Sequence, residues 1–273
     1  MPDPTTTSSP APNAARHAAF DVLSRETFDL LVVGGGITGA GVALEAARRG
    51  LSTALVERDD FASGTSSRSS RLVHGGVRYL EHGQIGLVFE SSRERRTLER
   101  IAPHLVRPLS FVWPVYAGAR IPRWKLAAAL TLYDLLALFR NVGRHERLDR
   151  AGVLAREPAL RRDALRGGAR YWDAATDDAR LTLATVRSAI AEGAVVVNHA
   201  GAESFRRDGN RIAGARVRDR LGTSDAVEVR ARVVVNAAGP WSDMVERLAD
   251  GSVPPSVLGS KGVHLSVPRA RNR

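Results

Sequence analysis

The chain has 273 residues, 44% of them apolar, and a length and apolar content that suit one large domain or two interleaved ones. It contains no cysteine, which excludes disulfides, thiolate metal sites and thiol nucleophiles, and we expect no metal site. The net charge of +11 comes from arginines scattered along the chain without interleaved aromatic residues, so nucleic acid is not an expected partner.

The first 25 residues begin as a stretch rich in Pro, Ser, Thr and Ala, without an apolar run long enough for a signal peptide. Their composition predicts a disordered N-terminal tail over 1–25.

A strand, a glycine-rich turn, a helix and a second strand are predicted next. The apolar run 28–33 has the pattern of a strand buried on both faces. The helix then ends at Gly50, and a second strand over 51–56 ends at Glu57. The turn between the first strand and the helix has the G-x-G-x-x-G spacing, with glycines at Gly34, Gly36 and Gly39.

Each of these positions has a task in dinucleotide binding. Gly34 turns the chain tightly, Gly36 lets the backbone approach a pyrophosphate, and Gly39 permits close contact between helix and strand. The anion then lies at the helix N-terminus. Glu57 can accept hydrogen bonds from a ribose and repels a 2′-phosphate, which favours FAD or NAD over NADP.

The segment 59–80 is too polar and too rich in glycine to continue as a strand and helix repeat. A long ordered loop of this kind is typical of a functional site. A nicotinamide dehydrogenase would instead have a second nucleotide half-unit at this place.

An apolar stretch of fourteen residues at 126–139 is interrupted by Asp134. It is shorter than the roughly 20 residues that span a membrane. The stretch predicts either a buried helix or a helix that lies against a membrane surface.

Further strands and a helix are expected after residue 170. Asp177 and Asp178 precede a predicted helix, where they fit either a helix start or an acid-base pair. Two strands are expected on either side of the turn at 208–210. The apolar run 233–235 leads into Ala-Ala-Gly-Pro, and small residues at the end of such a strand are where ligands approach an open sheet.

The motifs "GTSSRSSRLVHGGVRYLEHG", "YWDAATDDARLTLATVRSA", "VVVNAAGPWSD" and "GSKGVHLSVPR" follow the glycine turn in this order. In order and spacing they resemble the FAD-dependent glycerol-3-phosphate dehydrogenases, respiratory enzymes that pass electrons to quinone. The resemblance covers 28–269. It implies an α/β fold of the D-amino-acid-oxidase-like superfamily, in which a Rossmann-like FAD-binding domain is interleaved with an antiparallel, β-rich substrate domain.

The resemblance also implies roles for individual residues. The glycine turn, Glu57 and the hydroxyl-rich loop would bind FAD, and the backbone at 74–76 would run past the flavin ring. The implied cofactor-binding residues are Gly34, Gly36, Gly39, Glu57, Thr65, Ser66, Ser70, His74, Gly75, Gly76, Ala238 and Gly239. Arg78 and Tyr79 would face the substrate, and His264 would take the proton of the C2 hydroxyl. The competing interpretation of His264 is a core histidine.

The implied domains are a first FAD-binding part at 26–105, a substrate-domain insertion with the apolar helix at 106–168, and a second FAD-binding part at 169–250. The start of the substrate-domain sheet follows at 251–273. Glu45 stands where the family usually has aspartate. Family members also have a longer C-terminal part, so we expect this chain to be truncated.

The expected activity is oxidation of sn-glycerol 3-phosphate to dihydroxyacetone phosphate, with electrons passed to a quinone. Two alternatives remain open, an amino-acid or sarcosine oxidase-like flavoenzyme and an inactive flavin-binding fragment. The expected location is cytoplasmic, with peripheral association at the inner face of the cytoplasmic membrane as a further option.

Overall fold

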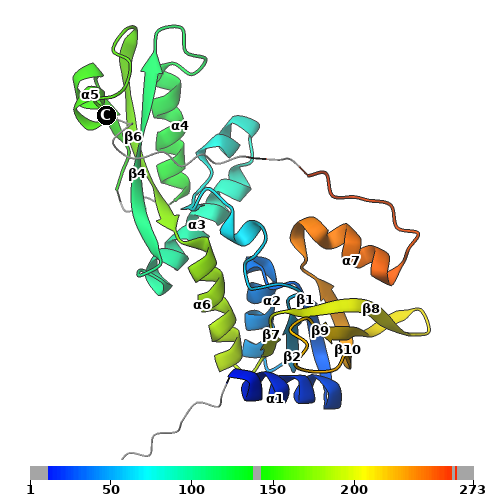
Figure 1. The fold of residues 1–273 in the computed structure, drawn as a ribbon. Helices are drawn as coiled ribbons and strands as arrows, with labels where there is room; N and C mark the ends of the chain where they lie inside the picture. The colour runs from blue at the N-terminus through cyan, green and yellow to red at the C-terminus, as the bar shows by residue number, and fades with distance from the viewer. Residues whose placement is uncertain (1–11, 138–142, 260–261, 263–273) are drawn as a thin grey trace, which may run out of the picture. The chain divides into compact units, whose positions relative to one another are not determined.

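The structure, a computed structural model, describes residues 12–137, 143–259 and 262 (Figure 1). The chain divides into two compact units. The first unit holds the described residues up to Ser69 and from Asp178 to 259, and the second holds those from Ser70 to Asp177 together with Gly262. These divisions differ from the expected boundaries after 105 and 168, because the strands at 72–73 and 106–116 both pair with the strand at 165–176.

A six-stranded sheet forms the centre of the first unit, in the order β7-β2-β1-β10-β9-β8. The first four of these strands run parallel, and β10, β9 and β8 pair antiparallel. In chain order the parallel strands read 3-2-1-4, as in a doubly wound nucleotide-binding sheet. The strands are β1 (Thr27–Val33), β2 (Thr53–Val56), β7 (Val195–Val197), β8 (Ala200–Asp208), β9 (Arg211–Asp219) and β10 (Val227–Asn236).

Alternate residues of β1 and β2 face two different apolar clusters. Val32 and Leu55 pack with Ala43 and Ala47 of α2 (Ile37–Arg48), in a cluster that also includes Ala189 of α6 (Asp178–Ala191). The residues on either side of Val32 in β1 and of Leu55 in β2 contribute to the other cluster. Asp178 lies in the first turn of α6, which confirms the helix-start interpretation of this residue.

The expectation of a disordered tail is wrong for the described part of 1–25. Pro12–Arg25 forms the helix α1, drawn in dark blue in Figure 1, and the rest of the expected tail lies outside the described residues. Phe20 and Leu23 of α1 are completely or almost completely buried in the cluster that lies across β1 and β8–β10. The early prolines and hydroxyl residues dominate the composition and hide this apolar pair, whose burial stabilises the helix.

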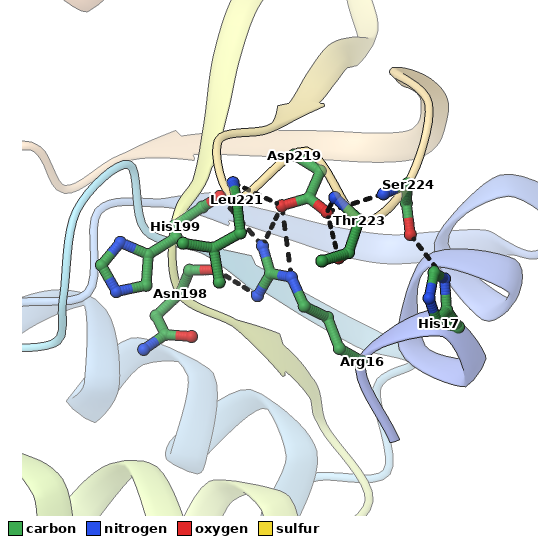
Figure 2. A network of polar contacts seen from close by, with 8 residues as sticks. All are labelled: Arg16, His17, Asn198, His199, Asp219, Leu221, Thr223 and Ser224. Atoms are coloured by element: carbon green, nitrogen blue, oxygen red, sulfur yellow. Dashed lines mark hydrogen bonds and ion pairs between the residues drawn. The ribbon is translucent and has the colours of Figure 1, made fainter. Parts of the chain in front are cut away.

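A buried ion pair holds α1 to the end of β9 (Figure 2). Nη2 of Arg16 lies 2.5 Å from Oδ1 of Asp219, and the guanidinium also donates to the carbonyl oxygens of Asn198 and His199. The other Asp219 oxygen accepts the Thr223 N–H at 2.9 Å and the Thr223 hydroxyl at 2.6 Å. Although burial opposes it, these donors hold the pKa of Asp219 well below its usual range.

An antiparallel sheet forms the second unit, in which β6 (Leu165–Thr176) is flanked by β4 (Val106–Tyr116) and by the short β3 (Leu72–Val73). The strand β5 (Glu146–Leu148) also pairs with β6. In the described part of the chain β4 pairs only with β6, so Pro108 and Pro114 occupy an edge strand, where proline is tolerated. The helices are α3 (Ile85–Ile101), α4 (Arg123–Leu136) and α5 (Arg150–Arg156).

The described part of the apolar stretch 126–139 lies in and just after α4 and is buried along one face. Leu126, Leu130 and Tyr133 are at most 2% exposed, which supports the buried-helix interpretation for this face. Trp124, Leu132 and Leu135 are exposed. Within the described ranges no helix is long and apolar enough to cross a membrane.

Candidate functional site

A cavity of about 410 Å³ lies in the first unit, at the carboxyl ends of β1 and β2. Seven of the expected cofactor-binding residues line it: Gly34, Gly36, Glu57, Thr65, Ser66, Ala238 and Gly239. Residues separated by about 200 positions therefore meet at one edge of the parallel sheet, the edge at which doubly wound folds bind ligands.

The three turn glycines have different surroundings. Gly34 has φ +117°, and a Cβ there would lie 2.5 Å from the carbonyl oxygen of Ala237. Gly39 lies outside the cavity lining, where a Cβ would lie 1.9 Å from the carbonyl oxygen of Gly34. At Gly36 the nearest atom to a Cβ is the Ser66 hydroxyl at 3.1 Å. Gly34 and Gly39 thus permit close backbone packing, and Gly36 leaves the N-terminus of α2 open to the cavity.

Hydrogen-bonding groups converge at the N-terminus of α2. The Ile37 N–H, an unpaired donor in the helix ladder, donates to the Ser66 hydroxyl oxygen at 2.9 Å. Ser66 lies in the short 3₁₀ helix η1 (Thr65–Ser67) of the hydroxyl-rich loop. This loop therefore supplies an oxygen at the position where helix N-termini bind anions.

Both carboxylate oxygens of Glu57 accept backbone N–H groups. Gly35 donates to Oε2 at 2.6 Å and Asp59 donates to Oε1 at 2.8 Å. These bonds fix the side chain at the end of β2, in the cavity wall. Each oxygen retains a further lone pair for a ligand hydroxyl.

An apolar wall completes the cavity, and the sequence motifs did not indicate it. Ala200 and Ala202 come from β8, and Met244, Val245 and Leu248 come from α7 (Ser242–Ala249). The helix follows the 3₁₀ helix η3 (Gly239–Trp241), whose Trp241 packs against Gly64. The i, i+1 and i+4 spacing of 244, 245 and 248 was the only signal for this wall.

The other expected site residues belong to the second unit or lie outside the described residues. Ser70 and His74 are exposed, and Gly75 and Gly76 are buried. The 3₁₀ helix η2 (Val77–His82) contains Arg78 and Tyr79, and the Tyr79 ring lies 6.1 Å from that of His74, centroid to centroid. His264 lies outside the described residues.

The residues of the first-unit cavity fit the dinucleotide part of FAD. The α2 N-terminus and the hydroxyls of the loop match a pyrophosphate, the Glu57 carboxylate matches a ribose diol, and the apolar wall matches an aromatic base. Gly36 leaves open the space that a Cβ would fill at the helix N-terminus.

Comparison with known proteins agrees with this chemistry. The chain is 46% identical over 261 residues to a protein named glycerol-3-phosphate dehydrogenase from Mycobacterium leprae, an alignment that covers 94% of this chain and 44% of that protein. It is 41% identical over 261 residues to an alpha-glycerophosphate oxidase from Streptococcus pyogenes, covering 94% of this chain and 42% of the oxidase.

A solved structure of glycerol-3-phosphate dehydrogenase from Bacillus halodurans, complexed with FAD, is also similar. It has a TM-score of 0.68 and 37% identity, over 86% of this chain and 39% of that chain. The chain thus spans less than half the length of these relatives. The family model described as DAO, FAD dependent oxidoreductase, matches residues 29–273. The chain therefore belongs to the DAO family of FAD-dependent oxidoreductases.

Proposed function

We propose that the whole protein oxidises sn-glycerol 3-phosphate to dihydroxyacetone phosphate, using FAD, and passes the electrons to a quinone. The cavity at the α2 N-terminus, lined by Glu57 and by the loop hydroxyls, is the observation that carries the cofactor assignment. The substrate assignment is supported by the names of the relatives that are 41–46% identical.

The chain's own residues have separate tasks in this reaction. Arg78 binds the substrate phosphate, because a guanidinium matches phosphate oxygens in a bidentate manner. Tyr79 holds a substrate oxygen through its phenol, and His264 takes the proton of the C2 hydroxyl as general base. Bound FAD supplies the acceptor for the hydride from C2.

The remaining assignments concern residues that bind the cofactor. Thr65, Ser66 and Ser70 donate to the cofactor, and Ala238 and Gly239 lie beside it. The backbone of His74, Gly75 and Gly76 adjoins the flavin ring, where the lack of a Cβ at the two glycines suits contact with a flat ligand.

Anaerobic reduction tests the substrate. The FAD-loaded protein is mixed with glycerol 3-phosphate, and the visible flavin absorption is followed, with sarcosine and a D-amino acid in parallel. We expect glycerol 3-phosphate alone to bleach the flavin. Bleaching by an amino acid instead would favour the amino-acid oxidase alternative, and a flavin that no substrate reduces would favour the inactive fragment.

The electron acceptor needs a separate measurement, because dehydrogenases and oxidases both occur among the relatives. Reoxidation of the reduced protein by a soluble quinone is compared with reoxidation by dioxygen. We expect the quinone to react faster. Rapid formation of hydrogen peroxide with slow quinone reduction would assign an oxidase.

We also propose peripheral association with the inner face of the cytoplasmic membrane through the exposed side of α4. Trp124, Leu132 and Leu135 are 69%, 38% and 52% exposed, and Lys125 lies beside the Trp124 ring. An apolar strip with basic neighbours suits an anionic surface. Sedimentation with anionic vesicles tests this proposal, and binding that is unchanged in Trp124→Ala would contradict it.

A further inference from the structure

Three polar side chains form a buried cluster in the second unit. Arg95 comes from α3, Tyr133 from α4 and Asp173 from β6. The three residues are 3%, 1% and 6% exposed. Neither the glycine turn nor the hydroxyl-rich loop indicated this cluster, and the proposed function assigns it no task.

Asp173 is the centre of the cluster. Its Oδ1 accepts a hydrogen bond from the Tyr133 hydroxyl at 2.7 Å and another from the Nη1 group of Arg95. The same arginine nitrogen donates to the Tyr133 oxygen at 2.7 Å and to the carbonyl oxygen of Trp172 at 3.2 Å. Burial raises the pKa of Tyr133 well above its ordinary value, so the phenol stays protonated and continues to donate to Asp173.

A third donor to the same carboxylate oxygen comes from the loop. The N–H of Gly75 donates to Oδ1 of Asp173 at 3.0 Å, across 98 positions of sequence. A buried backbone N–H requires a partner, and here that partner is charged and is held in place by two further donors. The carboxylate therefore connects the loop backbone to α3, α4 and β6.

Close packing reinforces this hydrogen bond. A Cβ at Gly75 would lie 2.2 Å from the Tyr133 hydroxyl oxygen and 2.5 Å from Oγ of Ser92. Among the described residues that serine oxygen has no hydrogen-bond partner, so the serine fills space against the glycine. The cluster thus requires a glycine at position 75, because a Cβ there would point into the space that the cluster occupies.

The expected site residues adjoin Gly75 in the chain, so the same contacts limit their backbone. Gly76 has φ +75°, and a Cβ there would lie 2.1 Å from the Tyr79 ring. The Tyr79 N–H donates to the Gly76 carbonyl oxygen at 2.8 Å. With its backbone fixed at Gly75 and turned at Gly76, the chain has defined positions for the α-carbons from which the His74 and Tyr79 side chains extend.

Stability alone gives a weak reason for such a cluster. Burying an arginine and an aspartate desolvates both, and a well-packed apolar trio is often as stable. A buried, hydrogen-bonded polar network instead specifies one arrangement of the groups that it joins.

We propose that Asp173, held by Arg95 and Tyr133, is a positioning residue that fixes the backbone of His74–Val77 and thereby orients His74 and Tyr79. The inference rests on the proposed function only where it assigns His74 to the flavin and Tyr79 to the substrate. In the proposed arrangement the cluster itself touches neither the flavin nor the substrate. It acts through the Gly75 N–H.

Amide hydrogen exchange of the 273-residue chain tests the positioning directly, without FAD or substrate. Asp173→Asn retains the shape but removes the charge, and Tyr133→Phe removes only the hydroxyl. We expect exchange in the 72–80 segment to become about tenfold faster in Asp173→Asn and to rise less in Tyr133→Phe. Asp219→Asn is the matched control, because it breaks a buried arginine pair in the first unit.

Equal exchange of 72–80 in Asp173→Asn and in Asp219→Asn would overturn the proposal. If Asp173→Asn does not fold, Tyr133→Phe decides in the same way, because its ring still fills the site. An increase confined to 72–80 and the segments that contact it supports positioning, and a uniform increase over both units contradicts it.

A second readout separates this proposal from the proposed function. In protein that carries FAD, we expect Tyr133→Phe to lower kcat for glycerol 3-phosphate about tenfold, while FAD affinity changes less than about twofold. A kcat equal to that of the unmodified protein would contradict the positioning role. If the unmodified protein takes up no FAD, the proposed function fails, and the exchange experiment still decides the positioning.

Discussion

Arg16 and Asp219 lie 2.5 Å apart between Nη2 and Oδ1, although 203 positions separate them. The aspartate side chain is inaccessible and the arginine side chain is 10% exposed. We therefore predict that Asp219→Asn lowers the free energy of unfolding by about 3 kcal/mol, because it leaves a buried guanidinium without its counter-charge. Urea denaturation measures the change.

Glu203→Gln provides the control, since Glu203 pairs with Arg218 at the surface of the same unit. Exposed pairs contribute little, so its unfolding midpoint should match that of the unmodified chain. A small effect of Asp219→Asn, equal to that of the control, would show that α1 does not depend on the ion pair.

The same pair predicts a pH dependence. The folded-state pKa of Asp219 lies below the ordinary value of 3.8, so the stabilisation is complete above that value. It is lost as the pH falls from about 4 toward the folded-state pKa, because the unfolded chain then binds a proton that the folded chain does not. Urea midpoints between pH 7 and pH 3 should fall more steeply for the unmodified chain than for Asp219→Asn. Parallel curves for the two proteins would contradict the assignment to this residue.

Gly39→Ala and Gly41→Ala separate two glycines of the same helix. A methyl group at Gly39 would lie 1.9 Å from the Gly34 carbonyl oxygen, whereas at Gly41 no atom lies within 4 Å. Gly39→Ala should cost about 2 kcal/mol or more and prevent FAD uptake, because α2 must move away from the turn. Gly41→Ala should stabilise the chain by about 0.5–1 kcal/mol. Thermal unfolding and FAD titration test both, and equal effects would contradict the close-packing explanation.

Ser66→Ala tests the hydroxyl that accepts the Ile37 N–H. We expect FAD affinity to fall about threefold to tenfold, which corresponds to one net hydrogen bond of roughly 1 kcal/mol. Ser67→Ala is the neighbouring control, since the Ser67 hydroxyl donates to the Gly64 carbonyl oxygen at the longer distance of 3.3 Å. Fluorescence titration with FAD measures both affinities, and equal losses would assign no special role to Ser66.

The nucleotide-binding part of the fold follows from short-range signals. Gly34, Gly36 and Gly39 locate the turn, and Glu57 marks the end of β2. The turn Asp208-Gly209-Asn210 correctly indicated the β8–β9 hairpin, because these residues suit a tight connection. These features depend on neighbours within a few residues, so the sequence predicts them.

Long-range pairings set the parts that the sequence did not predict. Composition alone suggested a tail for α1, whose order depends on Arg16 meeting Asp219 and on Phe20 entering the core. The unit boundary near Ser69 depends on the pairing of β3 with β6. Asp134, which interrupts the apolar stretch, was a usable signal for a long-range contact of this helix. Its carboxylate accepts a hydrogen bond from the backbone N–H of His145 at 3.0 Å.

Gly75→Ala tests a glycine that sequence analysis assigned to flavin approach alone. The added methyl would overlap the Tyr133 hydroxyl and Ser92, so it must displace the buried cluster even without a cofactor. We predict a loss of about 2 kcal/mol or more in unfolding free energy in the absence of FAD. Gly86→Ala in α3, with no atom within 4 Å of the added carbon, should be neutral or stabilising. If Gly75→Ala leaves the FAD-free protein as stable as the control and weakens only flavin binding, the glycine serves the cofactor and the cluster does not require it.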